Sequence, residues 1–300
     1  MGKPAFCSAL AFLVLAPLTD GASASRRFFL EGDGSVYLVN AHAGGGGPVT
    51  YRTPKGHYPE SVHRRISQIF GVPPHASEGI ALRLIALLDY LQDHLKGGPI
   101  RVVSGYRSPA DNEGLRRRGR LAARTSMHLE GMAADIEMEG VEGKRLWEFV
   151  RSLGCCGAGY YGANAVHVDV GPSRFWDETS TGVDRDLGAR NRLVLLRTEW
   201  DLYRPGEEVR MALGRLTDYP VGVRPAIQVA DRGRVVAGAR LEGARATCVV
   251  IPNRGAARSL VWTIPRGLAP VDRAWVRISF CHRPFPHMPE AIESNPISIR

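Results

Sequence analysis

The stretch SMHLEGMAAD, residues 126–135, places a histidine and an aspartate seven positions apart. From Ala133 to Glu139 the side chains alternate, with acidic residues at every second position and apolar residues between them, which predicts a β-strand. His128 then falls in the loop before the strand, and Asp135 lies on the strand itself. Since a single histidine or aspartate is usually only a hydrogen-bonded structural residue, a metal site here needs a third ligand.

The stretch VHVDV, residues 166–170, supplies that third ligand. With the preceding residues 160–164 it predicts a β-hairpin, and its strand can place His167 on the same sheet face as Asp135. A catalytic zinc ion takes three protein ligands, commonly imidazole and carboxylate, and keeps one position open. The sequence therefore predicts a zinc site formed by His128, Asp135 and His167.

The order of the motifs carries a family resemblance. SGYRS at residues 104–108 comes first, the S-x-H-x-x-G-x-A-x-D pattern follows at 126–135, and V-H-V-D-x-G ends the series at 166–171. This combination resembles the M15 class of zinc D-Ala-D-Ala peptidases, and most closely the DUF882 branch, which looks like periplasmic murein endopeptidases. The resemblance covers roughly residues 28–176.

The resemblance implies a Hedgehog/DD-peptidase-like α+β domain in which His128, Asp135 and His167 hold zinc and Arg107 points at the substrate. It implies an exported metallopeptidase that hydrolyses D-amino-acid-containing peptide bonds of peptidoglycan cross-links, as a murein endopeptidase or a D,D-carboxypeptidase. The chemistry agrees, because zinc activates water and polarises a carbonyl, and a guanidinium can hold the developing oxyanion or a substrate carboxylate. We expect Ser126 and Tyr160 to contribute to substrate binding.

The general base is the open part of the pattern. Many relatives carry an acid three residues before the last histidine, where this chain has Asn164. Asp169 is the best substitute, either as the base or as a residue that orients the imidazole of His167. Glu130 is a weaker candidate that we expect to be solvated, and Trp176 is expected to serve packing.

Asn164 also favours a second function, a catalytically silent module that keeps zinc and binds peptidoglycan or a protein partner. An enzyme with a serine or cysteine nucleophile is disfavoured, because no G-x-S-x-G elbow occurs in the sequence.

The N-terminus has the layout of a secretory signal peptide. Lys3 precedes an uncharged, mainly apolar run over residues 5–18, and the A-x-A pattern at 22–24 predicts cleavage after Ala24. The run is too short to span a bilayer, so we expect a periplasmic or secreted protein with no transmembrane span in the mature chain.

Export makes disulfides possible for the four cysteines that remain in the mature chain. Cys248 and Cys281 lie in strand-like stretches of the last third and are expected to pair. Cys155 and Cys156 are adjacent, and they are either two free thiols or a vicinal bridge.

The formal charge of +9 comes almost entirely from arginine, since the chain has 39 basic residues and lysine is rare. Genome composition explains this pattern, and so does attraction to an anionic partner such as a wall polymer. No basic run with interleaved aromatic residues is present, so nucleic acid is not expected as a partner.

The chain is expected to hold two domains, residues 25–185 and 186–300. The first has an amphipathic helix over residues 78–96, a strand over 100–104 and a basic helix over 109–118. Beyond Asp186 about seven short β-rich segments recur between turns, which predicts an all-β Ig-like sandwich. We expect this second domain to bind the wall or a protein partner.

Overall fold

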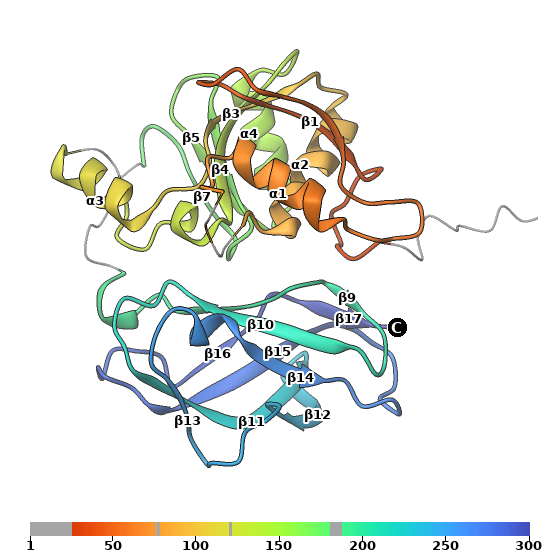
Figure 1. The fold of residues 1–300 in the computed structure, drawn as a ribbon, viewed down its shortest axis with the longest axis vertical. Helices are drawn as coiled ribbons and strands as arrows, with labels where there is room; N and C mark the ends of the chain where they lie inside the picture. Colours follow the sequence, from red (N-terminus) through yellow and green to blue (C-terminus); the bar gives the residue numbers. More distant parts are fainter. Residues whose placement is uncertain (1–25, 75, 77–78, 120–121, 181–187) are drawn as a thin grey trace, which may run out of the picture.

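The computed structural model describes residues 26–74, 76, 79–119, 122–180 and 188–300. Two apolar cores divide the described chain close to the predicted boundary. The first collects buried residues from Phe28 to Val170 together with Leu195, and the second runs from Val194 to Ile299. Figure 1 shows the two parts stacked, with the N-terminal one above and the C-terminal one below. The predicted signal segment, residues 1–24, lies outside the described residues.

One seven-stranded mixed sheet forms the first part, in the order β2-β1-β3-β4-β6-β5-β7. The central neighbours β3, β4, β6 and β5 are antiparallel, whereas β1 pairs with β3 and β5 pairs with β7 in parallel. The strands are β1 (Ser35–Asn40), β2 (Gly46–Thr50), β3 (Ile100–Ser104), β4 (Ala133–Met138), β5 (Gly157–Tyr160), β6 (Val166–Asp169) and β7 (Arg174–Trp176).

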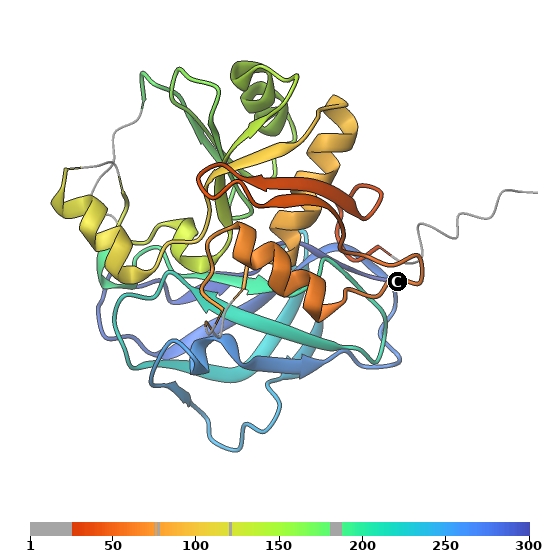
Figure 2. The same cartoon turned by 45° about the horizontal axis from the view of Figure 1, so that its top comes forward.

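Four α-helices accompany this sheet within the described residues. They are α1 (Glu60–Ile69), α2 (Leu82–Leu95), α3 (Pro109–Arg117) and α4 (Gly143–Ser152). The leucine-rich face of α2 is buried, and α4 packs on β4, β5 and β6. Helix α3 begins with Ser108 as its N-cap and projects from one side of the molecule (Figure 2).

In the second part, two sheets enclose the second core. The smaller has the order β14-β10-β8, and the larger has the order β12-β11-β15-β17-β9, with β13 beside β11 and β16 beside β15. The strands are β8 (Leu195–Thr198), β9 (Leu202–Tyr203), β10 (Glu208–Gly214), β11 (Val221–Asp231), β12 (Arg234–Arg240), β13 (Val249–Ile251), β14 (Leu260–Thr263), β15 (Val271–His282), β16 (Ala291–Glu293) and β17 (Ile297–Ile299).

The mixed α and β composition agrees with the predicted α+β class. The strand predicted over residues 100–104 is confirmed, whereas the helix predicted from residue 78 begins at Leu82, and α1 was not predicted. The predicted Cys248–Cys281 disulfide is present, and the Cys155–Cys156 pair forms a vicinal bridge. Among the described helices, none combines the length and the hydropathy that crossing a membrane requires.

Polar contacts join the two parts. Arg83 at the start of α2 pairs with Asp201 in the β8–β9 turn, at 2.7 Å and nearly out of solvent. Arg27 makes two hydrogen bonds to the carboxylate of Glu207, at 2.7 and 2.9 Å. The amide of Asp201 also donates to the Arg27 carbonyl at 2.9 Å, so these contacts form one region that fixes the N-terminal part against the β-rich part.

Candidate metal centre

The sheet register places the predicted ligands from β4 and β6 side by side. Asp135 pairs directly with His167, and His167 pairs on its other side with Gly159 of β5. Gly159 in turn lies opposite Trp176 of β7. Side chains of directly paired residues lie on the same face of a sheet, so one row runs across four strands. The neighbours of Asp135 along β4 are fully buried apolar residues of the opposite face.

The third predicted ligand reaches the row from a short 3-10 turn, η2 (Met127–Glu130). Ser126 precedes this turn, and its hydroxyl accepts a hydrogen bond from the amide of His128 at 3.4 Å. Gly131 ends the turn with φ +63°, a left-handed conformation that glycine adopts without strain. His128 is therefore held by the local structure of the motif and is almost completely buried.

Three donor atoms converge where these elements meet. His128 Nε2 lies 3.2 Å from His167 Nδ1 and 3.4 Å from Asp135 Oδ1. His167 Nδ1 lies 2.9 Å from the same Asp135 oxygen. Within the described residues, these three form one of two groups whose geometry suits a metal ion. The structure thus brings together all three predicted metal ligands.

The outer hydrogen bonds of the two imidazoles decide which nitrogen faces the cluster. His128 Nδ1 lies 2.6 Å from the carbonyl oxygen of Gly105, which can only accept, so this nitrogen carries the hydrogen. His167 Nε2 lies 3.0 Å from Asp169 Oδ2 and donates to it in the same way. The remaining nitrogens, His128 Nε2 and His167 Nδ1, therefore face the cluster, and they are the ones that can bind a metal once they carry no proton.

Charges at the cluster favour a positive ion at its centre. Burial by itself would raise the pKa of Asp135, but the neighbouring His128 and His167 hold it well below its usual range. Burial works against a charged His167, but its hydrogen bonds with Asp135 and Asp169 raise its pKa to about 9. Without a metal, His167 therefore carries a proton that it shares with the Asp135 carboxylate. A divalent cation in the same place would compensate the negative charge of Asp135 more strongly.

Asp169 is a fully buried residue behind His167. Its carboxylate accepts hydrogen bonds from His167, from the amide of Gly171 at 2.8 Å and from Arg174 at 2.5 and 3.1 Å. Although burial would raise its pKa, His167 and Arg174 lower it to about 2. Asp169 contacts the nitrogen of His167 that faces away from the ligand cluster, and it is an ionised acceptor at neutral pH.

Arg107 borders the cluster on its other side. Its guanidinium donates to Asp135 Oδ2 at 3.0 Å and to Ser104 Oγ at 3.0 and 3.2 Å, and 18% of its side chain is exposed. Because Asp135 Oδ1 faces the imidazoles, the two oxygens of this carboxylate serve different partners. Arg107 is thus fixed beside the predicted metal ligands.

Two predicted substrate-binding residues lie differently from this expectation. Ser126 uses its hydroxyl to cap η2. Tyr160 alternates with Gly159 along β5 and therefore belongs to the opposite face, where its ring lies 6.0 Å from that of Trp147 on α4. The adjacent residue Tyr161 comes closer, since its hydroxyl accepts from Trp176 Nε1 at 3.2 Å.

Sequence reasoning missed the contribution of β7. The Trp176 ring, expected to serve packing alone, lies 5.1 Å from the ring of His167, and Arg174 holds Asp169. Two glycines of β5 make this approach possible. A Cβ at Gly157 would lie 2.1 Å from Asp169 Oδ2, and one at Gly159 would lie 2.4 Å from Trp176. The glycines at every second position of the GAGY stretch were the available signal.

Asn164, which replaces the acid of many relatives, lies in the exposed turn between β5 and β6. Another acid reaches this turn from beyond β7. A Cβ at Gly162 would lie 2.1 Å from Glu178 Oε2, so the carboxylate of Glu178 sits directly over the turn.

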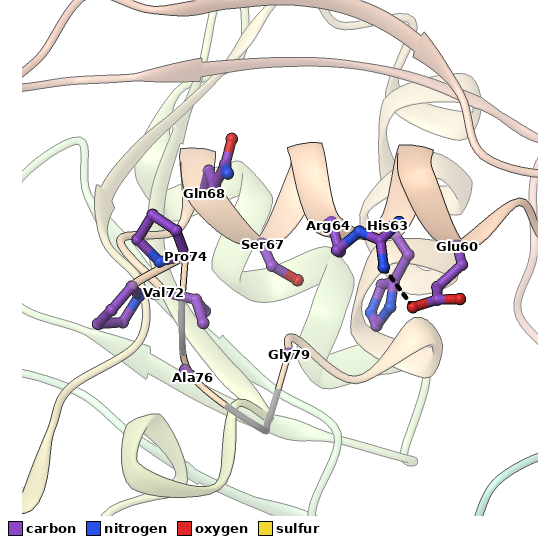
Figure 3. Close-up of a pocket in the computed structure, with 10 residues that line it drawn as sticks. Glu60, His63, Arg64, Ser67, Gln68, Val72, Pro74, Ala76 and Gly79 are labelled. Carbon is purple, nitrogen blue, oxygen red and sulfur yellow. Dashed lines mark hydrogen bonds and ion pairs between the residues drawn. The ribbon is translucent and has the colours of Figure 1, made fainter.

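Two other features lie apart from this cluster. A pocket of about 390 Å³ runs along α1, and its lining includes His63, Arg64 and Ser67 (Figure 3). None of its lining residues belongs to the predicted site.

The second metal-like group of the described residues combines Asp33, Asp89 and Asp93. Asp89 Oδ2 accepts from the Gly34 amide and the Tyr51 hydroxyl, so this group ties the loop before β1 to α2.

Comparison with known proteins places these residues in a family. Residues 33–176 match the family model Peptidase_M15_2, described as peptidoglycan L,D-endopeptidase MepK. The protein of that name from Escherichia coli K12 is 40% identical over 79 residues, which are 26% of this chain and 43% of the relative. The probable MepK of Haemophilus influenzae is 40% identical over 83 residues, 27% of this chain and 45% of the relative.

The chain thus spans less than half the length of the curated relatives it matches. No solved structure matches it. The match ends at the last residue of β7, so the β-rich second part lies outside it. The ordered motifs and the matches over β1 to β7 show that residues 33–176 are similar to the M15-class peptidase family, in the branch that the MepK model describes.

Proposed function

We propose that this chain is an exported zinc metallopeptidase that hydrolyses D-amino-acid-containing peptide bonds in peptidoglycan cross-links. The observation that carries the proposal is the convergence of His128 Nε2, Asp135 Oδ1 and His167 Nδ1, with the outer nitrogen of each imidazole bound to an acceptor. The printed name of the relatives favours an L,D-endopeptidase, which cuts between an L and a D centre. D,D-carboxypeptidase activity is the alternative specificity of the same site.

The residues divide the chemistry between them. His128, Asp135 and His167 would hold a zinc ion, which would supply activation of a water molecule and polarisation of the scissile carbonyl. Arg107 provides a fixed positive charge beside the ligands, and we propose that it holds the carbonyl oxygen as negative charge develops, or a substrate carboxylate. Tyr161 and Trp176 replace Tyr160 as the proposed substrate-contacting aromatic residues, because they lie on the ligand face of the sheet.

For Asp169 we propose the orienting role rather than that of a base. Its carboxylate is buried and bound to the outer nitrogen of His167, so it cannot reach a water molecule on the inner side of the ring. We propose Glu178 as the proton acceptor for the attacking water, because its carboxylate lies over the turn where relatives carry their acid. Ser126 acts through His128 by capping the turn that carries it.

The remaining assignments belong to the same proposal. The N-terminal domain is of the Hedgehog/DD-peptidase type, the C-terminal domain is an Ig-like sandwich, and the predicted signal peptide sends the chain to the periplasm or outside the cell. The second candidate function, a silent zinc-containing module that binds peptidoglycan or a partner, is favoured by one observation, the asparagine at position 164.

The zinc assignment predicts the effect of removing one ligand. His128→Ala should lose most bound zinc, because two ligands remain from a three-ligand site. His94→Ala removes an exposed histidine of α2 and should leave the zinc content unchanged. Zinc bound per chain after dialysis, measured by mass spectrometry, checks both. One full equivalent retained by His128→Ala would remove His128 from the site.

The orienting role of Asp169 predicts a change in metal affinity. Asp169→Asn should lower zinc affinity by about 10- to 100-fold, the effect typical of losing a hydrogen-bond partner of a ligating imidazole. Asp177→Asn, at a partly exposed site just beyond β7, serves as the control, and competition with a chromogenic chelator gives the affinities. Wild-type affinity combined with lost turnover would instead make Asp169 the proton acceptor.

The role of Glu178 predicts a separation of binding from turnover. Glu178→Gln should lower kcat by roughly 10²- to 10⁴-fold, the usual contribution of general base catalysis, and leave zinc affinity unchanged. Glu139→Gln, at an exposed site just beyond β4, should alter neither. If Glu178→Gln retains wild-type kcat, another group accepts the proton.

The substrate assignment predicts chelator-sensitive cleavage of cross-linked muropeptides by the mature chain, with L,D cross-links cut faster than D,D cross-links. Chromatography of the products with and without chelator measures this directly. Release of only a terminal D-alanine would favour a carboxypeptidase. If the zinc-loaded protein shows no chelator-sensitive cleavage, the enzyme assignment is contradicted and the catalytically silent binding module is favoured.

A further inference from the structure

The motif residue Glu130, expected to be solvated, is instead buried between the two domains. Its side chain is 5% exposed and meets arginines of the C-terminal domain. Arg258 of the short helix η4 (Ala256–Arg258) contacts Glu130 Oε2 at 2.7 Å. Arg254, in the turn before η4, reaches both carboxylate oxygens at 3.4 Å. Glu130 lies only two residues beyond the metal ligand His128.

The same loop is held at further points by the C-terminal domain. Arg254 also donates to the carbonyl oxygen of Leu129 at 2.6 Å. Arg215, directly after β10, donates its backbone amide to Glu130 Oε1 at 2.9 Å. Its guanidinium donates to the carbonyl oxygen of Thr125 at 2.9 Å and to the Thr125 hydroxyl at 3.1 Å. The contacts therefore fall on both sides of His128.

Arg215 extends this contact toward the ligand cluster. Burial and the neighbouring charge of Arg174 lower the pKa of Arg215 to about 10, although Asp169 and Glu130 act in the opposite direction. Arg174 is the residue that holds Asp169 behind His167. Arg215 of the C-terminal domain thus lies near the contact between Arg174 and Asp169 that orients His167.

We propose that the C-terminal domain helps to position a ligand of the metal centre. Arg215, Arg254 and Arg258 hold the loop that carries His128, through their contacts with Thr125, Leu129 and Glu130. This inference rests on the proposed zinc function. Buried ion pairs add little net stability but impose a defined geometry, because breaking one leaves a buried charge without its partner. A ligand loop held in this way keeps His128 Nε2 aimed at the cluster before the metal arrives.

The test compares interface ion pairs that differ in their distance from the loop. Glu130→Gln and Arg258→Gln should each weaken zinc binding at least tenfold, whereas Arg258→Lys, which keeps the charge, should recover part of the affinity. The matched control is Glu207→Gln, which breaks the ion pair with Arg27 across the same interface without touching residues 125–131. It should retain wild-type zinc affinity.

Zinc alone is the probe, and chelator competition on folded, full-length mature protein gives its affinity. Amide hydrogen exchange provides a second readout, since residues 126–131 should exchange faster in Glu130→Gln and at the wild-type rate in Glu207→Gln. Wild-type affinity in both loop-contacting variants would overturn the proposal. So would unfolding of both, because the contacts would then serve only domain association. A wild-type chain that binds no zinc would overturn the proposed function itself.

Discussion

The candidate site depends on one constraint, the fixing of two imidazole rings by hydrogen bonds on their outer sides. Gly105 accepts from His128 and Asp169 accepts from His167, so the inner nitrogens of both rings face Asp135. Three electron-pair donors at such short separation repel one another unless a positive charge lies among them. The fold therefore holds an arrangement that favours binding of a cation, and the surrounding residues support this geometry rather than compete for it.

The sheet makes this constraint possible by leaving space on one strand. Gly157 and Gly159 carry no side chain on the ligand face of β5, and Arg174 and Trp176 extend across them from β7. Arg174 compensates the buried charge of Asp169, which in turn holds His167. A series of contacts thus connects β7 at the sheet edge to the centre of the site. Gly157 and Gly159 are as necessary for these contacts as the charged residues, because they leave the space that Asp169 and Trp176 occupy.

Local patterns allowed much of the site to be predicted. The period-two alternation predicted β4, the hairpin signal predicted β6, and the motifs predicted the three converging residues, whereas β5 lies mostly before the predicted hairpin. The sequence could not predict which of Tyr160 and Tyr161 lies on the ligand face of the sheet, because this depends on the register of β5 against β6. The burial of Glu130 could not be predicted either, since its partners lie 85 to 128 residues away in the chain.

The central claim is that His128, Asp135 and His167 are the zinc ligands. X-ray absorption spectroscopy of the zinc-loaded mature chain tests this most directly, because it reports the type and number of the atoms bound to the metal. The account predicts two imidazole nitrogens with the remaining ligands oxygen and no sulfur. A spectrum with a sulfur ligand, or with a single imidazole, would contradict it.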